Sequence, residues 1–456
     1  MLAVRLHGNS DLRVDQVPEP DAAGPGQVRV EPQWCGICGT DLHEYAHGPL
    51  YTPAENLPQV IGHEFSAVVA ETGPGVTALR PGDRVAVLPH VFCGSCFYCL
   101  RGRQGLCSNL LLTGVTWPWG GLAGQAIVPA SQVVSLPDGV SFEQGAVLEP
   151  LATVVHGVER LGLRPGDSVL ITGGGPIGQL AVLVAAAAGA GSIFLSEPQA
   201  ARRLMAERNG ATVFDPASAD VAAEVGELTG GLGADCAIEC SGSQAGLDAC
   251  VASVRRAATV AVIAIHLGDR LVQPEGWVWR DLTVAGVWSF KIWDTPRILA
   301  QIAAGTLPVE RVVTSRIAMR DVVREGIQRL SDPGGDQVKI LVSAAGQAAA
   351  GQAGAEREEA RRAGSTGRPR WSSAAPRAWA WPAPSGSAPR ARTWPCSTSR
   401  RARSRRQRPR WGPAATRWRR PAATCPGRPT WRRRWRAPSS GSARSTSSST
   451  RRPWSS

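Results

Sequence analysis

Short segments of alternating apolar and polar residues fill the first 150 positions of the chain. Runs such as "GQVRVEPQW", "FSAVVAETG" and "DRVAVLPH" are separated by Gly and Pro. Alternation with a period of two, bounded by turn residues, is typical of half-buried β-strands. The pattern therefore predicts a β-rich domain over residues 1–152.

The pattern changes near residue 165. Apolar runs such as "DSVLITG", "SIFLSE", "ADCAIEC" and "ATVAVIAI" alternate with helical segments such as "PIGQLAVLVAAAAG" and "QAARRLMAERNG". Strands and helices that alternate at this spacing predict an α/β domain with a parallel, doubly wound sheet over residues 153–290. Residues 291–343 end in "QVKILVS", which we expect to be a strand that returns to the first domain.

The formal net charge of +13 combines two unlike parts of the chain. Residues 361–456 contain 25 Arg and no Lys, Asp or Glu, so the first 360 residues carry +13 minus +25, or −12. The C-terminal part also lacks Val, Ile, Leu, Met, Phe and Tyr, so it offers few side chains for a packed core. We expect residues 344–456 to form a disordered, Arg-rich tail.

Two interpretations of this tail stay open. Arginines on phosphates and tryptophans stacked on bases would make the chain a zinc-containing nucleic-acid-binding protein. Alternatively, the tail is the product of a frameshift in a GC-rich gene, because a shifted reading frame permits strings that resemble segments of short-chain dehydrogenases. We adopt the frameshift as the hypothesis and expect no nucleic-acid partner.

The N-terminal segment "MLAVRLHGNSDLRV" has no cationic stretch followed by an apolar run, so it does not resemble a signal peptide. The longest apolar run, "LAVLVAAAA", is shorter than the ~20 residues that cross a bilayer. We therefore expect a cytoplasmic protein without a membrane partner. In a reducing compartment, clustered cysteines more often bind metal than form disulfides, and the odd total of 11 Cys argues against full pairing.

One segment, "CGSCFYCLRGRQGLC", contains four cysteines in C-x2-C-x2-C-x7-C spacing. Four thiolates can surround one tetrahedral zinc ion and leave no position open for water, so the spacing predicts a structural zinc site. An iron–sulfur cluster and a redox pair are the alternatives. The predicted ligands are Cys93, Cys96, Cys99 and Cys107.

Two other segments, "WCGICGTDLHEY" and "VIGHEF", contain a mixed set of candidate ligands. Cysteine, histidine and a carboxylate together can form a zinc site with one position open for water or substrate, as a catalytic zinc requires. The candidates are Cys38, Thr40, Asp41 and His43 in the first segment, with His63 and Glu64 in the second.

The segment "GGGPIG" places Gly173, Gly175 and Gly178 in G-x-G-x-x-G spacing between a predicted strand and a predicted helix. This context is typical of a dinucleotide-binding loop, whose pyrophosphate lies at the N-terminus of the helix. Glu197, at the end of the next strand, would accept hydrogen bonds from a ribose diol and repel a 2′-phosphate. NAD is therefore favoured, although Arg202 and Arg203 leave NADP as an alternative.

In this order, the motifs resemble those of the zinc-dependent medium-chain dehydrogenases over residues 1–343, in the branch that contains butanediol, sorbitol and threonine dehydrogenases. The resemblance implies a GroES-like catalytic domain, a Rossmann cofactor domain, one catalytic and one structural Zn2+, and NAD. It also implies a homodimer or homotetramer that oxidises a secondary alcohol or vicinal diol to the ketone, as butanediol and acetoin interconvert. A polyol or L-threonine is the alternative substrate.

The same resemblance assigns roles to residues. It makes Cys38, His63 and one carboxylate, Glu64 or Glu149, the ligands of the catalytic zinc, with Thr40 and His43 as a proton relay. A noncatalytic relative would have lost some of these ligands, and none is lost here. Ala257, Ala258 and Ala264 stand where relatives often have glycine. The implied cofactor contacts are Gly173, Gly175, Ile177, Gly178, Glu197 and Arg202.

Overall fold

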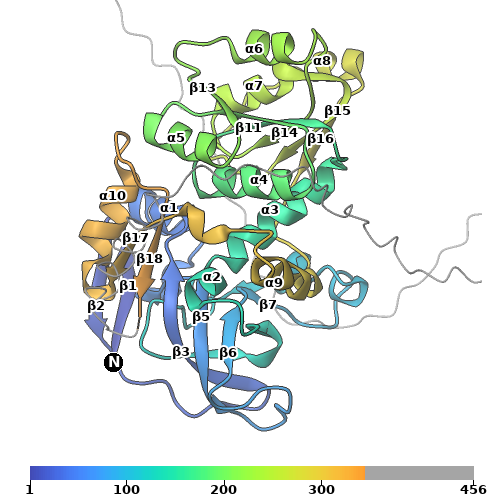
Figure 1. Ribbon diagram of the computed structural model, residues 1–456. Coiled ribbons are helices and arrows are strands. Elements are labelled where there is room, and N and C mark those ends of the chain that lie inside the picture. The colour runs from blue at the N-terminus through green and yellow to red at the C-terminus, as the bar shows by residue number, and fades with distance from the viewer. Residues whose placement is uncertain (345–456) are drawn as a thin grey trace, which may run out of the picture. The chain divides into compact units, whose positions relative to one another are not determined.

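The computed structural model describes residues 1–344 of the chain (Figure 1). The expectations for the C-terminal tail, namely its disorder, its frameshift origin and the absence of a nucleic-acid partner, concern residues 345–456 and lie outside the described residues. Within residues 1–344, no helix is long and apolar enough to cross a membrane.

Two sheets of mainly antiparallel strands form most of the β-rich part of the chain, and β7 (His90–Val91) and β8 (Leu111–Leu112) form a third, two-stranded sheet. The strands of the first two sheets are β1 (Leu2–Gly8), β2 (Asp11–Gln16), β3 (Gln27–Gly36), β4 (Gln59–Val60), β5 (Glu64–Thr72), β6 (Arg84–Val87), β9 (Ala126–Pro129), β10 (Val133–Ser135), β17 (Val313–Ala318) and β18 (Lys339–Ser343). The strand orders are β2-β1-β4 and β10-β6-β5-β3-β18-β17, with β9 also paired to β3. On β3, Val28 and Val30 are buried whereas Glu31 is exposed, so the alternation in the sequence selects the face that packs on the core. The predicted β-rich domain is confirmed.

Six parallel strands form the sheet of the second domain. They are β11 (Ser168–Thr172), β12 (Ser192–Ser196), β13 (Thr212–Phe214), β14 (Ala234–Glu239), β15 (Val254–Val262) and β16 (Thr283–Gly286), in the order β13-β12-β11-β14-β15-β16. Figure 1 shows helices on both faces of this sheet. On β11, Val169 and Ile171 join one hydrophobic cluster and Leu170 joins another, so both faces are buried. The predicted doubly wound sheet is confirmed.

The helices that cover this sheet follow its strands in the chain. They are α4 (Pro176–Ala187), α5 (Ala200–Arg208), α6 (Val221–Leu228), α7 (Gln244–Ser253) and α8 (Pro274–Arg280). Leu180 and Val184 of α4 lie in the same cluster as Val169, whereas Val221 of α6 and Cys250 of α7 lie in the cluster of Leu170. Helices on opposite faces therefore make separate cores, as the alternation of strands and helices predicts.

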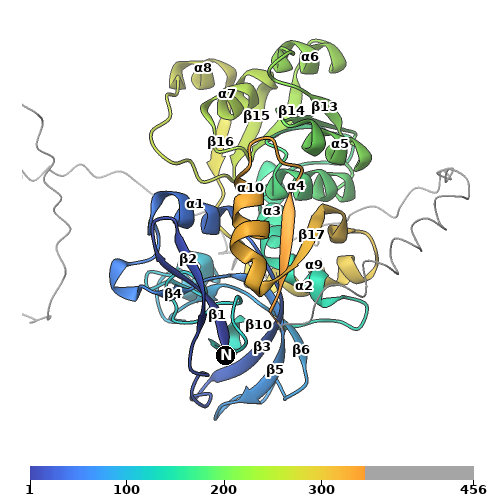
Figure 2. The ribbon, with the colours of Figure 1, turned by 90° about the vertical axis from the view of Figure 1, so that its left-hand side faces the viewer.

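Helix α3 (Leu148–Leu161) follows α2 (Phe142–Ala146) and precedes the parallel sheet in the chain. The predicted domain boundary after residue 152 falls inside α3. At the other end of the described chain, β18 pairs antiparallel with β3, with Leu341 opposite Gly36. Figure 1 and Figure 2 show the orange C-terminal strands beside the blue N-terminal strands. The remaining elements are α1 (Gly39–His47), α9 (Thr295–Ala303) and α10 (Gln328–Ser331).

Ala257 lies in β15 at a φ of 57°, a left-handed conformation that is unfavourable for a residue with a Cβ. The pairing of β15 with β14 has a register shift here, and the Ala257 side chain is exposed. We expect Ala257→Gly to raise the free energy of unfolding by about 0.5–1 kcal/mol, because glycine relieves the strain at some cost in chain entropy. Urea unfolding would measure this change.

Ala258 provides the matched control for this substitution. Its side chain is buried in the cluster of Leu170, and its φ is not positive. We expect Ala258→Gly to lower the free energy of unfolding by about 1 kcal/mol, because it removes a packed methyl group and adds chain entropy. Equal losses in both variants would contradict the proposed strain at Ala257.

Candidate metal centres and cofactor site

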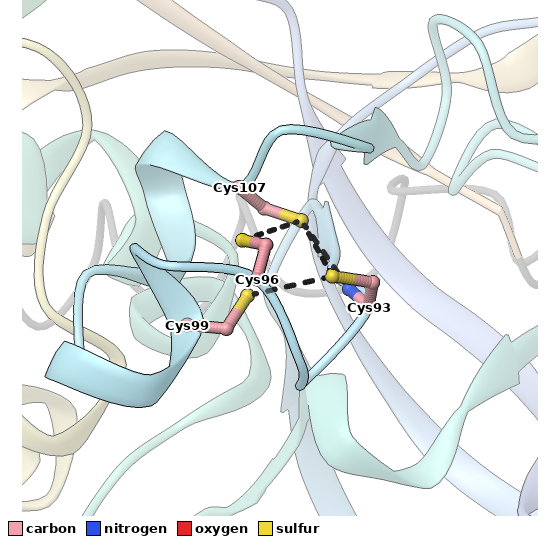
Figure 3. Close-up of side chains that lie close together, drawn as sticks. All are labelled: Cys93, Cys96, Cys99 and Cys107. Atoms are coloured by element: carbon pink, nitrogen blue, oxygen red, sulfur yellow. Dashed lines mark hydrogen bonds between the residues drawn. The ribbon is translucent and has the colours of Figure 1, made fainter. Parts of the chain in front are cut away.

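The four clustered cysteines converge on one point in the loop that precedes β8 (Figure 3). The Sγ atoms of Cys93 and Cys107 are 3.5 Å apart, those of Cys96 and Cys107 are 3.9 Å apart, and those of Cys93 and Cys99 are 4.0 Å apart. All four thiols are free of disulfides. Sulfurs at the corners of a tetrahedron around zinc, each ~2.3 Å from the ion, would be ~3.8 Å apart. The cluster therefore has the dimensions of a four-sulfur zinc site.

The backbone around this cysteine lobe (residues 93–107) favours thiolates. Backbone N–H groups of Cys99 and Ser108 lower the pKa of Cys96 to about 5. Those of Ser95 and Cys96 lower the pKa of Cys93 to about 7. Burial, by contrast, raises the pKa of Cys99 to about 12, so this thiol would lose its proton only when a metal binds. Zinc binds the thiolate form of cysteine, so Cys93 and Cys96 are the two ligands best prepared for a metal at neutral pH.

The second group of candidate ligands combines Cys38, His63 and Glu64, whose ligand atoms all lie within 4.8 Å of one another. The register of β3 and β5 explains this convergence. Gly36 at the end of β3 pairs with Glu64 at the start of β5, so the residues just beyond the paired ends meet. Segments that are 25 residues apart in the chain thus supply one mixed set of sulfur, nitrogen and oxygen ligands.

His63 is held among negatively charged groups. Its Nδ1 atom is buried without a hydrogen-bond partner and lies 3.8 Å from Oδ1 of the buried Asp41. Asp41 also accepts a hydrogen bond from the backbone N–H of Cys38 at 2.9 Å. Burial by itself lowers the pKa of His63, but Cys38 and Asp41 raise it well above its usual range. A divalent cation would balance the same negative charges.

Lys339 is a buried cation beside Glu64 that the motifs do not reveal. Its Nζ atom forms an ion pair with Oε2 of Glu64 and donates a hydrogen bond to the carbonyl of Ile37 at 3.0 Å. Burial lowers the pKa of Lys339, but the charges of Glu64 and Cys38 and the hydrogen bond to Glu64 together raise it above its usual range. The only hint in the sequence is a lysine inside the apolar strand "VKILVS".

The other residues predicted for this site surround the three ligands. Glu149, at the start of α3, lies outside the ligand group, and burial followed by the charge of Glu64 raises its pKa to about 7. Thr40 is close to Cys38, with 3.7 Å between Oγ1 and Sγ. His43 has a buried Nδ1 atom without a partner, and burial lowers the pKa of His43. The structure thus brings Glu64, rather than Glu149, into the ligand group.

The glycine loop joins β11 to α4 as predicted. Gly173 has a φ of 89°, and a Cβ on Gly178 would lie 1.8 Å from the carbonyl oxygen of Gly173. Gly175 is the N-cap of α4. The backbone N–H groups of the first helical turn lack partners within the helix, so they are free for a ligand at this loop. Ile177, in that turn, packs against the core. The loop has the close strand–helix packing that dinucleotide binding requires.

Glu197 lies directly after β12, beside the glycine loop. Its Oε2 atom accepts a hydrogen bond from the backbone N–H of Gly174 at 2.6 Å, and its Oε1 atom accepts one from Gln199 at 2.8 Å. The two arginines that follow are held to different degrees, and Nε of Arg202 is buried without a partner. Arg203 pairs with Asp215 at 2.9 Å, and Arg202 donates to the carbonyl of Gln337 at 3.4 Å.

The chain matches two family models. Residues 24–138 match the alcohol dehydrogenase GroES-like domain, and residues 176–304 match the zinc-binding dehydrogenase domain. These matches confirm the fold class predicted from the sequence, a GroES-like domain followed by a Rossmann domain.

Similar proteins cover the same part of the chain. The (R,R)-butanediol dehydrogenase of Bacillus subtilis is 35% identical over 355 residues, which cover 75% of this chain and 99% of the relative. The L-threonine 3-dehydrogenase of Pyrococcus furiosus is 34% identical over 325 residues, with 71% and 92% covered. A putative zinc-binding dehydrogenase from Sinorhizobium meliloti, solved with NADP, is 33% identical at a TM-score of 0.67, with 75% and 98% covered.

The chain belongs to the zinc-dependent medium-chain dehydrogenase family. It is an oxidoreductase that acts on CH–OH groups. The mixed ligand group fits the zinc of this family, and the glycine loop fits a nicotinamide dinucleotide.

Proposed function

We propose that the protein oxidises a secondary alcohol or vicinal diol to the ketone with NAD as hydride acceptor, and that butanediol and acetoin are its substrate pair. The observation that carries the proposal is the mixed group of Cys38, His63 and Glu64 in a chain 35% identical to a butanediol dehydrogenase. A polyol or L-threonine is the second candidate, supported by the similarity to a threonine dehydrogenase.

Cys38, His63 and Glu64 would hold the catalytic zinc, with Glu149 as the alternative carboxylate. A zinc ion held there supplies Lewis acidity, which lowers the pKa of an alcohol. Glu64 binds Lys339 through one carboxylate oxygen and has a second oxygen to offer as a ligand. Cys93, Cys96, Cys99 and Cys107 would hold the second, structural zinc.

Thr40 and His43 would take the proton that the alcohol releases and pass it to solvent. Both side chains come from α1, which begins directly after Cys38. Because burial lowers the pKa of His43, its imidazole is neutral near pH 7 and can accept a proton. Gly173, Gly175 and Gly178 would hold the pyrophosphate of the cofactor, whose nicotinamide would supply the hydride acceptor.

The charge of Glu197 and the contacts of Arg203 support NAD over NADP. Glu197 places a carboxylate at the end of β12, where a ribose diol would be accepted and a 2′-phosphate repelled. Arg203 pairs with Asp215 and donates to the carbonyls of Glu197 and Pro198, so its guanidinium is not free for a phosphate. Arg202 donates only to the carbonyl of Gln337 and has an Nε atom without a partner, so it leaves NADP as the alternative cofactor. Ile177 would contact the cofactor from the first turn of α4. The cytoplasmic location and the homodimer or homotetramer remain predictions.

Initial rates, measured for butanediol and for acetoin with NAD and with NADP, test this proposal. We expect (R,R)-butanediol to reduce NAD+ and acetoin to oxidise NADH, with NAD+ preferred over NADP+ by at least about tenfold in kcat/KM because of the charge on Glu197. The absorbance of the reduced cofactor reports both directions. If both butanediol and acetoin are inert while sorbitol or L-threonine reacts, the second candidate replaces the first.

Glu197→Ala tests the basis of the cofactor preference in the same assay. We expect the ratio of kcat/KM for NAD+ to that for NADP+ to fall by about tenfold, because the variant no longer repels a 2′-phosphate. Glu207→Ala, an exposed glutamate on α5, is the matched control and should leave the ratio unchanged. A retained ratio in Glu197→Ala would assign the selectivity to other residues.

A further inference from the structure

Tyr51 presents a buried phenol oxygen for which the structure offers no hydrogen-bond partner among residues 1–344. A buried hydroxyl without a partner loses its bonds to water and gains none in return. Such an atom is therefore a candidate for contact with a ligand. Neither Tyr45 nor Tyr98, the other two tyrosines of the chain, has an unpartnered buried hydroxyl.

The loop that carries Tyr51 is held in place by Glu44, a buried residue of α1. The Glu44 carboxylate accepts hydrogen bonds from the backbone N–H groups of Leu50 at 3.0 Å, Tyr51 at 2.8 Å and Thr52 at 2.8 Å. The Thr52 hydroxyl donates to the carbonyl of Val115 at 3.1 Å. Three charge-assisted hydrogen bonds and this contact fix the backbone at Tyr51, so its phenol is preorganised.

Glu44 ties the Tyr51 loop to α1, the helix that begins directly after the metal ligand Cys38. Burial raises the pKa of Tyr51, and the negative charges of Glu44 and Cys38 raise it further, so the phenol keeps its proton and can donate a hydrogen bond. His43, one turn before His47 on the same helix as Glu44, also has an unpartnered buried nitrogen. Two polar atoms without partners thus belong to α1, which follows Cys38, and to the loop that Glu44 of α1 binds.

The elements that hold Tyr51 belong to the domain of the metal ligands. Glu44 lies on α1 directly after Cys38, and Val115 lies in the loop after β8. None of the hydrogen bonds that fix the loop comes from the parallel sheet that carries the glycine loop. The phenol is thereby associated with the substrate side of the site rather than with the cofactor.

We propose that Tyr51 is a specificity-determining residue whose phenol donates a hydrogen bond to a second oxygen of the substrate, on the carbon next to the reacting carbinol. The inference rests on the proposed function, in which Thr40 and His43 serve the reacting oxygen. A substrate with one oxygen would leave the phenol unpaired, whereas a vicinal diol or hydroxyketone would pair it. Tyr51 thus selects for vicinal oxygen atoms.

Tyr51→Phe tests the inference with two alcohols of the same carbon skeleton, (R,R)-butanediol and secondary butanol. We expect kcat/KM for the diol to fall about tenfold and kcat/KM for the monohydric alcohol to change less than about twofold, because only the diol loses a hydrogen bond. The zinc content, the KM for NAD+ and the melting temperature should stay unchanged, because the hydroxyl makes no bond within the protein.

Each other outcome is decisive. Equal losses for both alcohols, or a change confined to the KM for NAD+, would overturn the role of Tyr51 and leave the proposed function intact. If the wild-type enzyme has no higher kcat/KM for the diol than for the monohydric alcohol, the role of Tyr51 is likewise overturned and the proposed function is left intact. A wild-type enzyme inert toward both alcohols would overturn the proposed function and the inference with it. Tyr98→Phe, with a side chain 39% exposed on the cysteine lobe, is the control and should change neither rate.

Discussion

Replacing Cys38 with serine is expected to lower turnover by on the order of a thousandfold and to remove one of two zinc equivalents per chain. A Lewis-acidic metal contributes several kcal/mol of transition-state stabilisation, and each ~1.4 kcal/mol corresponds to a factor of ten in rate. The Cys38 sulfur is the only thiol in its ligand group, and hydroxyl oxygen is a poor substitute for thiolate. Elemental analysis and initial rates on the same preparation would measure both effects.

Cys35→Ala is the matched control for this substitution. Cys35 lies in the same "WCGIC" segment, but its side chain is buried in the core of the β-rich domain and its Sγ contacts the carbonyl of Gly36 at 3.6 Å. We expect this variant to lose about 1 kcal/mol of stability and to keep both zinc equivalents and its turnover. Full zinc content and full turnover in Cys38→Ser would refute the proposed catalytic site.

In Cys38→Ser, the cysteine lobe is expected to keep its zinc, because its four ligands are separate from the ligand group of Cys38. Cys93, Cys96, Cys99 and Cys107 all come from one short loop, and none of them belongs to the group around Cys38. One remaining zinc equivalent in Cys38→Ser would thus report on the lobe. Loss of both equivalents would instead indicate that the substitution unfolds the protein, which the melting temperature would reveal.

Much of the fold could be predicted because it is encoded in local patterns. The uninterrupted apolar run at Val169, Leu170 and Ile171 predicts a strand that is buried on both faces. The structure gives the reason: these residues pack in two hydrophobic clusters on opposite faces of the sheet, so a polar side chain would be buried on either face. The cysteine lobe could also be predicted, since its four ligands lie within 15 residues and their spacing alone defines a site.

Features that depend on tertiary register were not predictable. Lys339 reaches Glu64 across 275 residues, because β18 pairs with β3 and β3 pairs with β5. Tyr51 is oriented by a carboxylate that binds three backbone N–H groups, and no periodic pattern signals such a contact. The grouping of Glu64 with Cys38 and His63 also depends on the register that places Gly36 opposite Glu64.

After the loss of turnover in Cys38→Ser, the second large effect is expected from breaking the ion pair of Lys339 and Glu64, which stabilises the fold. The two side chains are 1% and 2% exposed, and Lys339→Met leaves the shape of the lysine stem while it removes the charge. Breaking a buried pair by removal of one partner costs about 3–5 kcal/mol, because an uncompensated charge stays buried. We expect the urea midpoint of the zinc-stripped protein to fall accordingly, and by less in the zinc-loaded protein, where the cation offsets the charge of Glu64.

A double-mutant cycle separates the ion pair from the packing of Lys339. Glu64→Gln alone leaves the lysine charge buried, so it should also destabilise the zinc-stripped protein, whereas the double variant should recover most of the loss. Arg255→Met breaks an ion pair with Asp235 whose side chains are 39% and 31% exposed, and it should cost less than about 1 kcal/mol. Additive losses in the cycle would show that Lys339 acts through its hydrogen bond to Ile37 and its packing, and that Glu64 does not need a cation beside it.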